Sequence, residues 1–306
     1  MIELVCGDSF IKIFERLHNL KVHKIPLEYS NGKRVLLFMC KCGRKWIALP
    51  HYYSEAYVQT DLSSYKEIPP FSLIETQDGN LFCTKNIHWE IRDRKAFSSN
   101  VYADKLNFKI ELKEDLFSVF SSNVRRKIRK AFSLGIEVKT TGRHLIRDFY
   151  KVYSKRMFEL GSPFSDKSSV KKLLKLQAGK IFVAYYNKMP IGAATLMRRD
   201  EKSFENVLFA TDQNYNNLYT SYALHYEMMR FSLQEKAESY YLGRSTRSSS
   251  VHDFKRHFHP IEIPLYWSYS HKTKNIRDNK LLKKLWRLLP FGVAKRIGSF
   301  FYKRIY

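Results

Sequence analysis

The chain has 306 residues and a formal net charge of +25, because 54 lysines and arginines face 29 aspartates and glutamates. Hydrophobic residues make up 44% of it, which excludes an intrinsically disordered chain, and no apolar run reaches the roughly 18 residues that a membrane-spanning helix needs. The positive charge favours nucleic acid, anionic lipid or another polyanion as a partner. Four cysteines are too few for a disulfide framework, so we expect a reducing, cytoplasmic environment.

The first half contains a predicted hairpin, a strand and a basic helix. In residues 35–50, apolar runs flank Gly43, the residue there that most easily adopts a positive φ, and this pattern predicts two paired strands. Turn residues and hydrophobic spacing predict three further elements behind this hairpin. They are a strand beginning at residues 108–111, a helix at residues 115–134 that Gly135 ends, and a strand at residues 136–139.

The second half alternates more clearly between helix and strand. From residue 144 to residue 160, apolar residues recur every three or four positions, which predicts a helix that Gly161 ends. Three apolar runs separated by short polar turns then predict an antiparallel meander. The elements expected after Gly161 are strands at 181–186, 191–197 and 204–210, a helix at 219–235 and a strand at 239–242.

The last segment, residues 271–306, carries 11 lysines and arginines and one acidic residue. On a helical projection of residues 280–289 the apolar and basic side chains segregate, which predicts an amphipathic helix that Pro290 ends, with a second short helix behind it. Either this helix packs back on the core, or it lies on the anionic inner face of the plasma membrane. The membrane-binding residues would be Trp286, at the level of the headgroups, with Lys283, Lys284 and Arg287.

A set of motifs occurs in a fixed order along the chain. Residues 123–131 contain Arg-Arg-Lys-Ile-Arg-Lys-Ala and are followed by Gly135, residues 160–163 read Leu-Gly-Ser-Pro, and residues 243–246 (Gly-Arg-Ser-Thr) precede residues 253–255 (Asp-Phe-Lys). The set resembles the Fem-type branch of the GNAT acyltransferases over roughly residues 40–270. It is close to the relatives associated with exopolysaccharide secretion.

This resemblance implies an α/β (α+β) fold of two tandem GNAT-like lobes with mixed, mainly antiparallel sheets. A helix pair, a three-stranded meander, a helix and a further strand is also the order of a GNAT core. The expected division is residues 1–140 for an N-terminal lobe, residues 141–270 for a C-terminal lobe, and residues 271–306 for the basic amphipathic tail.

The resemblance also implies acyl transfer onto a cell-envelope precursor, either peptidoglycan or polysaccharide, from an activated donor. Fem-type proteins include transferases that take amino acids from aminoacyl-tRNA. We expect no tightly bound cofactor, and the donor is either aminoacyl-tRNA or acyl-CoA. GNAT enzymes that use acetyl-CoA bind its pyrophosphate with a glycine-containing loop before a helix, and residues 212–221 contain no glycine, which disfavours CoA.

The candidate site lies directly after the last predicted strand. Arg244 and Lys255 are candidates to bind a phosphate or carboxylate. Alternatively, Lys255 would stabilise the oxyanion that forms when an amine attacks an activated ester, and Ser245 lies beside Arg244 in the chain. Asp212 is a candidate general base, although acidic residues at strand ends more often cap helices. The alternative for residues 243–255 is a flexible polar loop.

The basic helix and the histidines have competing interpretations. Arg125, Arg126, Arg129 and Lys130 either bind phosphates of the substrate or form a solvated basic face. His252, His257 and His259 lack a convincing further ligand, and so does the Cys40-x-Cys42 pair with Cys83 or His51, so we expect no metal.

Three functions therefore compete. The leading hypothesis is an acyl- or aminoacyltransferase at the inner membrane face. The second is an acyl-CoA-dependent N-acetyltransferase with an atypical pyrophosphate site. The third is a non-catalytic GNAT relative that binds RNA or membrane.

Overall fold

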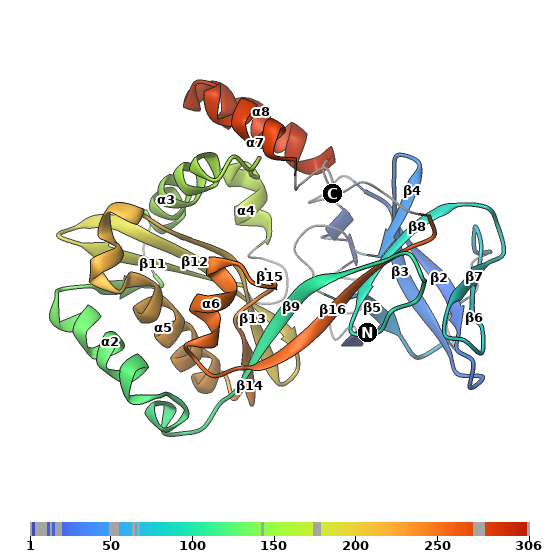
Figure 1. The fold of residues 1–306 in the computed structure, drawn as a ribbon, viewed down its shortest axis with the longest axis horizontal. Helices are drawn as coiled ribbons and strands as arrows, with labels where there is room; N and C mark the ends of the chain where they lie inside the picture. The colour runs from blue at the N-terminus through green and yellow to red at the C-terminus, as the bar shows by residue number, and fades with distance from the viewer. Residues whose placement is uncertain are drawn as a thin grey trace.

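The fold is taken from a computed structural model that describes residues 2–3, 11–12, 14–15, 20–48, 55–62, 65, 68–141, 144–173, 179–271 and 279–304. It is a mixed α/β architecture with helices on both faces of one end of a large sheet (Figure 1).

The strands, in chain order, are β1 (Ile2–Glu3), β2 (Val22–Glu28), β3 (Arg34–Cys42), β4 (Lys45–Ala48), β5 (Tyr57–Gln59), β6 (Leu73–Glu75), β7 (Leu81–Cys83), β8 (His88–Asp93), β9 (Val101–Glu111), β10 (Glu137–Lys139), β11 (Lys180–Tyr186), β12 (Met189–Asp200), β13 (Ser203–Thr211), β14 (Ser239–Tyr241), β15 (Ser245–Thr246) and β16 (Ile261–Tyr269). The helices are η1 (Leu116–Val119), α2 (Ser122–Ser133), α3 (Leu145–Glu159), α4 (Lys167–Leu173), η2 (Gln213–Leu218), α5 (Thr220–Gln234), α6 (Ser250–Arg256), α7 (Lys280–Leu288) and α8 (Phe291–Arg304).

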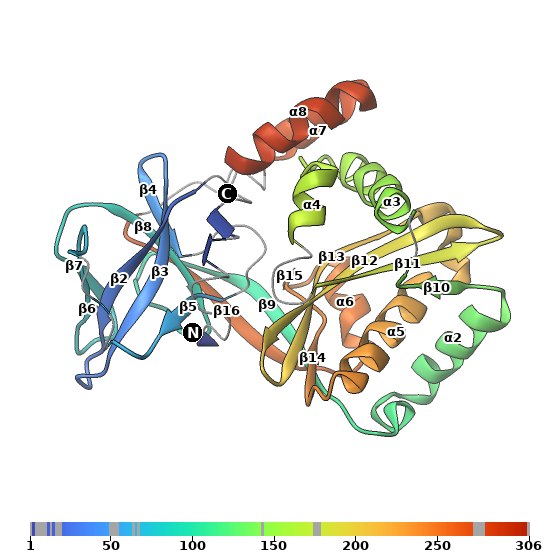
Figure 2. The ribbon, with the colours of Figure 1, turned by 180° about the vertical axis from the view of Figure 1, so that it is seen from behind.

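The described strands join one mixed sheet, whose main path runs β10-β11-β12-β13-β14-β9-β16-β8-β4-β3-β2-β6-β7. The long antiparallel pair β9–β16 carries the sheet from its helix-bearing end to its strand-rich end, where β16 also pairs with β8 (Figures 1 and 2). One continuous sheet thus connects the two halves of the molecule.

The meander β11–β12–β13 is antiparallel and is covered by helices on both faces. Alternate residues of β11 serve the two faces, since Val183 packs on the side of α3 while Phe182 and Ala184 pack on the side of α2 and α5. Figures 1 and 2 both show α3 and α4 on one face and α2 and α5 on the other. This double coverage explains why the strands of the meander read as nearly continuous apolar runs.

Most predicted elements are confirmed with boundaries within a few residues. Gly43 turns the β3–β4 hairpin with φ +63°, and Gly161 follows α3 with φ +71°. Two predictions need correction. The strand predicted to begin at residues 108–111 ends there, because β9 already starts at Val101. The helix predicted at residues 115–134 is broken at Ser121, whose side chain caps α2 by accepting from the Val124 N–H at 3.4 Å.

The division of the chain at residue 140 and the two tandem lobes stay predictions. Two elements that precede residue 140 pack with elements of the later half, since α2 contacts α5 and β10 contacts β11. In the part of the first hundred residues that the structure describes, strands β2–β8 dominate, with a separate core around Leu37, Trp46 and Trp89.

The tail forms two helices, as the sequence predicts, and they lie over α3 and α4 (Figure 1). Gly161 permits this close packing, because a Cβ there would lie only 2.7 Å from the backbone oxygen of Lys283. Gly298 does the same for α8 against Phe164. Of the described helices, none is long and apolar enough to cross a bilayer.

Candidate functional site

The sheet opens where β13 and β14 diverge. These strands pair in parallel only at Ser203–Glu205 with Ser239–Tyr241. Beyond that point β13 continues to Thr211, whereas the segment after β14 turns away through Gly243 into β15, which pairs with β9. On its opposite edge, the pairing of β13 with β12 is interrupted by a β-bulge. The divergence leaves one side of β13 without a neighbouring strand.

Gly243 is required at this divergence. Its φ is +76°, and a Cβ there would collide with the backbone oxygen of Asn206 on β13. Asn206 itself is buried and donates from Nδ2 to the carbonyls of Thr195 (2.9 Å) and Leu208 (3.1 Å), which holds the bulge in shape. The first glycine of the predicted motif therefore has a structural role that any larger residue would disturb.

A pocket of about 640 Å³ occupies the opening, and we call it the site pocket. Its walls come from the second half of β13, the end of α3, the first turns of α5, α6, and Tyr302 of α8. The residues with polar side chains in its lining are Tyr153, Arg156, Ser162, Glu205, Asn206, Thr211, Asn216, Ser221, His225, Arg244, Ser250, Lys255 and Tyr302.

Lys255 is the most unusual titratable group of the site pocket. It is only 6% exposed, and its Nζ donates to the carbonyl oxygens of Gly243 (2.6 Å) and Arg244 (3.0 Å). Burial lowers the pKa of Lys255 to about 7, while the Glu205 carboxylate opposes this shift and the Arg244 guanidinium adds to it. A lysine amine has three hydrogen-bonding positions, so one remains for a bound molecule.

Glu205 connects the site pocket to a buried charge cluster between the two halves. Its carboxylate accepts from Arg199 Nη1 at 3.0 Å and from Asn107 Nδ2 at 3.1 Å. Arg199, which is almost fully buried, also pairs with Glu55, and Glu55 accepts from Arg94 at 2.9 Å. This network satisfies the buried charges and holds Glu205 in place near Lys255.

His225 lies in the wall of the site pocket and was missed by the sequence analysis. Its Nδ1 is 2.7 Å from the Tyr240 hydroxyl, and its ring stacks on Phe209 with centroids 4.6 Å apart. Burial, reinforced by the charge of Lys255, lowers the pKa of His225 well below its ordinary value, so the ring is neutral. The sequence feature that could have identified His225 is its position among the apolar residues of the helix predicted at residues 219–235.

The structure brings three of the predicted site residues together and separates the fourth. Arg244 and Lys255 line the site pocket, and Ser245 is the next residue along the chain from Arg244, with its Oγ buried and without a hydrogen-bond partner among the described residues. Asp212 is not in the lining. It caps η2 by accepting from the Asn214 N–H at 3.1 Å, and it pairs with Lys155 at 2.8 Å.

The surroundings of Asp212 match the capping interpretation. Burial by itself would raise the pKa of Asp212, but the hydrogen bonds from Lys155 and Asn214 outweigh it and lower the pKa below the ordinary value. A carboxylate held in its charged form in this way is a poor proton acceptor.

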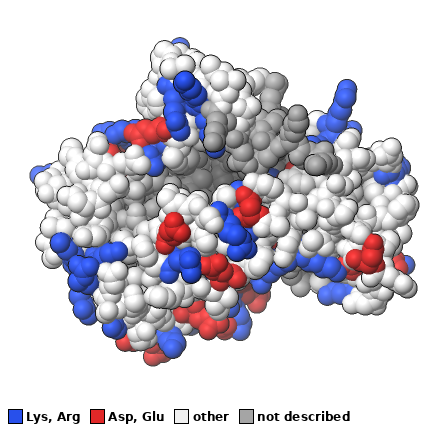
Figure 3. Space-filling view, viewed as in Figure 1, with Lys and Arg blue, Asp and Glu red and all other residues white. Residues whose placement is uncertain are grey.

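The basic residues of α2 lie away from the site pocket. Arg125, Arg126, Arg129 and Lys130 are absent from its described lining, and Figure 1 shows α2 at the far side of α5. Lysine and arginine side chains gather there on the surface, at the lower left of Figure 3. Two of them also lie over aromatic rings, Arg129 over Phe117 at 5.2 Å and Lys130 over Tyr219 at 5.7 Å.

The predicted membrane-binding residues divide between core and surface. Trp286 is 8% exposed and packs in the core with Ala294 and Tyr302, so it does not occupy the headgroup position expected for it. Lys284 and Arg287 are exposed, and Lys283 is half-buried beside Gly161. The helical projection identified the apolar face but not which of its residues meet the core.

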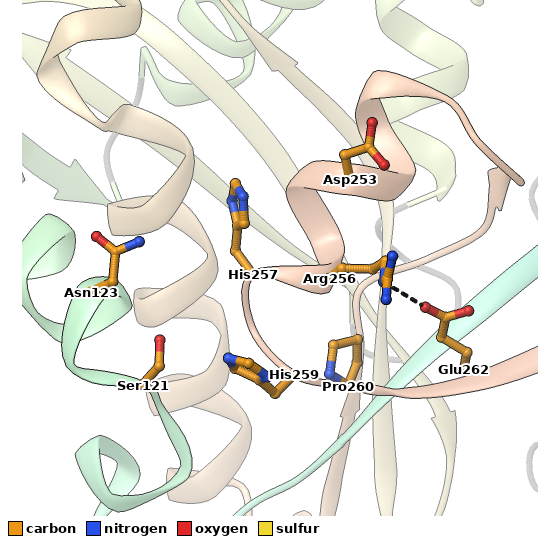
Figure 4. A pocket seen from close by; sticks show the side chains of 8 residues that line it. All are labelled: Ser121, Asn123, Asp253, Arg256, His257, His259, Pro260 and Glu262. Atoms are coloured by element: carbon orange, nitrogen blue, oxygen red, sulfur yellow. Dashed lines mark ion pairs between the residues drawn. The ribbon is translucent and has the colours of Figure 1, made fainter.

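A second, more open pocket lies between the start of α2 and α6 (Figure 4). His257 and His259 point in different directions in it, and Arg256 pairs with Glu262 at 3.3 Å. Among the described residues, no group of three or more histidines, cysteines and carboxylates could hold a metal ion. His51 lies outside the described residues.

Comparison with known proteins gives one family match and several solved structures of similar fold. Residues 118–256 match the family model of the acetyltransferase (GNAT) domain. FemX superposes with a TM-score of 0.58 at 12% identity, over 85% of this chain and 90% of FemX. L-PGS from Bacillus licheniformis gives 0.55 at 11% identity, over 94% and 98% of the two chains.

A third solved structure is the C-terminal domain (DUF2156) of a putative lysylphosphatidylglycerol synthetase from Agrobacterium fabrum, with a TM-score of 0.54 at 13% identity over 87% of this chain and 88% of that domain. The sequence matches none of the curated proteins. At these identities the structural likeness concerns the fold. Residues 118–256 therefore carry a GNAT acetyltransferase domain match, and the overall fold of the chain is similar to the folds of FemX and L-PGS.

Proposed function

We propose that this protein transfers an aminoacyl or acyl group from an activated ester to an amine or hydroxyl of a cell-envelope precursor, in the site pocket. The observation that carries the proposal is the buried amine of Lys255, whose pKa lies at about 7, in the opening between β13 and β14 of a GNAT domain. A group that titrates near neutral pH can both take and return a proton during a reaction.

The transfer itself needs no nucleophilic side chain. The acceptor nitrogen or oxygen forms a bond to the ester carbonyl carbon, its proton passes to the neutral amine of Lys255, and the carbon–oxygen bond to the donor then breaks with return of the proton to the leaving oxygen. Once protonated, Lys255 is a cation beside the developing oxyanion. Arg244 would hold a phosphate or carboxylate of the substrate, and Glu205 would keep Lys255 in place.

For the donor, the Fem-like fold supports aminoacyl-tRNA over acyl-CoA. In the segment where a pyrophosphate loop would lie, η2 and Tyr219 (φ +55°) replace a glycine-containing turn. Asp212 already occupies the Asn214 N–H there, and its charge would repel a diphosphate. The basic surface of α2 supports tRNA as the partner, since tRNA extends beyond any pocket.

The test is a transfer assay with purified protein and radiolabelled aminoacyl-tRNA, with peptidoglycan or polysaccharide precursors as acceptors. Lys255→Met should lower the rate about 100-fold or more, and the wild-type rate should fall below pH 7, as Lys255 becomes protonated. Lys113→Met, which changes an exposed lysine, is the matched control. Equal rates for Lys255→Met and Lys113→Met would refute the role of the amine.

The CoA-dependent alternative is tested by calorimetry, since micromolar affinity for acetyl-CoA would overturn the preference for aminoacyl-tRNA. The GNAT domain match is what keeps this alternative open. The non-catalytic alternative predicts that a cell carrying Lys255→Met has the phenotype of the wild type, whereas the transferase predicts the phenotype of the deletion.

We further propose that the protein works at the inner face of the plasma membrane. The two tail helices expose leucines beside exposed basic residues, with Leu281 63% and Leu288 72% exposed, and this combination suits an anionic bilayer. Leu281→Ser with Leu288→Ser should abolish cosedimentation with anionic vesicles, while Lys113→Met should not change it. Deletion of the whole tail is a poorer test, because it also removes Trp286 from the core.

A further inference from the structure

His225 lines the site pocket while one of its ring nitrogens is turned away to a partner in the core. The residue is only 1% exposed, and its Nδ1 lies 2.7 Å from the Tyr240 hydroxyl. The other ring nitrogen, Nε2, has no hydrogen-bond partner among the described residues. Nε2 is therefore the polar atom that His225 offers to a molecule bound in the pocket.

Aromatic neighbours hold the ring of His225 in one orientation. Phe209 stacks on it, and the rings of Phe254 and Phe258 lie 5.7 Å and 5.5 Å from it between centroids. Phe254 directly precedes Lys255, so the same turn of α6 contributes an aromatic contact to His225 and the amine to the pocket. The position of Nε2 is thus fixed before any substrate binds, as an effective hydrogen-bond donor in catalysis requires.

The hydrogen bond to Tyr240 decides which ring nitrogen carries the proton. Burial lowers the pKa of His225 well below its ordinary value, so the ring is neutral and only one nitrogen is protonated. The Tyr240 hydroxyl has two acceptors within reach, His225 Nδ1 at 2.7 Å and the Met228 thioether sulfur at 3.7 Å. Because sulfur is a weak acceptor, the hydroxyl donates to Nδ1, and the ring proton lies on Nε2.

Lys255 does not supply a donor for the carbonyl oxygen of the acyl group at the moment of attack. As a neutral amine it has two N–H groups and one lone pair, and its nitrogen already donates to the carbonyls of Gly243 and Arg244. The remaining lone pair is the site that takes the proton of the acceptor. The oxygen on which negative charge develops therefore needs a donor from another residue.

The other buried polar groups in the described lining do not meet this need. Apart from Tyr153 on α3 and Tyr302 on α8, the buried polar or charged side chains there are Glu205, Asn206, His225 and Lys255. Glu205 is an acceptor, and Asn206 already donates from Nδ2 to two backbone carbonyls. Of these four side chains, His225 is the one with an N–H left for the substrate.

We propose that His225 is a catalytic residue of the transfer, whose Nε2–H donates to the carbonyl oxygen of the acyl group and binds the oxyanion that forms there. This inference rests on the proposed transferase function and adds a donor to it. A neutral imidazole suits the role, because it donates without placing a second positive charge beside Lys255.

The electrons and the proton move in two steps. The acceptor atom bonds to the carbonyl carbon, one electron pair of the C=O double bond moves to the oxygen beside Nε2–H, and the acceptor proton passes to Lys255. The pair then re-forms the double bond while the bond to the donor oxygen breaks, and Lys255 returns the proton to that oxygen. His225 keeps its own proton throughout.

Rates of transfer from aminoacyl-tRNA test the role of His225. His225→Phe keeps a ring against Phe209 but has no N–H, so kcat should fall about 100-fold with little change in KM. His225→Gln, whose amide carries an N–H near the position of Nε2, should retain about a tenth of the wild-type kcat or more. His257→Phe changes an exposed histidine of the neighbouring chain segment, outside the described lining of the site pocket, and is the matched control.

Two outcomes of these assays would overturn the proposal. One is a kcat of His225→Phe equal to that of His257→Phe, which would show that the ring only fills space. The other is a kcat of His225→Gln as low as that of His225→Phe, which would show that an N–H at this position does not matter.

A measurement on the unchanged protein guards against misfolding of the variants. Proton–nitrogen correlation spectra of the imidazole rings, recorded near neutral pH on the full chain without substrate, show which nitrogen of His225 is protonated. The proton should lie on Nε2, and a proton on Nδ1 would overturn the proposal whatever the rates.

Failure of this inference and failure of the proposed function look different. A wild-type protein that transfers no aminoacyl or acyl group refutes the proposed function. Wild-type transfer that His225→Phe leaves intact, or a proton on Nδ1 in a protein that does transfer, refutes this inference alone.

Discussion

Replacing Lys255 by methionine tests the central electrostatic feature of the site through protein stability. In the folded protein the pKa of Lys255 is about 7, against an ordinary value of 10.5. Between these two values the unfolded chain binds more protons than the folded one, so stability rises with pH, and it is lowest where both states are protonated, below about pH 7. Each pH unit in this window is worth about 1.4 kcal/mol for one proton.

The expected magnitude comes from that window. From pH 7 to pH 9 the wild type should gain about 2 kcal/mol in free energy of unfolding relative to Lys255→Met, because methionine has no proton to lose. Urea unfolding at the two pH values measures this difference, and the exposed Lys113→Met should behave like the wild type. Parallel pH dependences of Lys255→Met and the wild type would refute the buried, near-neutral amine.

Three further substitutions test the packing around the site. Glu55→Gln leaves the buried Arg199 with one charge partner fewer, and it should cost about 3 kcal/mol in the free energy of urea unfolding. The control Glu28→Gln removes an exposed pair with Arg34 and should cost less than about 0.5 kcal/mol. Similar losses for the two variants would contradict a buried charge network. Gly243→Ala should lower the free energy of unfolding more than Gly32→Ala does. Both glycines have positive φ, but only at Gly243 would the added Cβ collide with a backbone atom, the oxygen of Asn206. Equal losses would contradict this close approach. Gly298→Leu should detach α8 and expose the tail to limited proteolysis, unlike Gly292→Leu on the same helix, which meets open space; a protease-resistant Gly298→Leu tail would contradict the packing against Phe164.

Local chain chemistry was enough to predict the elements around the site. Gly135 and Gly161 end their helices with positive φ, as their positions after apolar periodic runs indicated. The meander and α5 are predicted by runs of apolar residues between short turns, because these signals depend on neighbours within one element. The predicted strand at residues 239–242 also placed the motif at residues 243–246 directly after a strand, and β14 does precede it.

The composition of the pocket, in contrast, depended on contacts between distant segments. Glu205 on β13 and His225 on α5 interact electrostatically with Lys255 although all three are distant in sequence, and no local pattern marks where two parallel strands stop pairing. The basic helix α2 was expected either to bind substrate phosphates or to form a solvated basic face, and its place beyond α5 is set by which apolar face it buries.

The tail illustrates the same distinction within one helix. Segregation of leucines and lysines predicted an amphipathic α7, since that pattern is a property of the helix alone. Whether Trp286 or Leu288 would meet the core depends on the close approach of α7 to Gly161, which a helical projection does not contain. Folding therefore divided one apolar face into two surfaces, a buried one at Trp286 that packs in the core and an exposed one at Leu281 and Leu288.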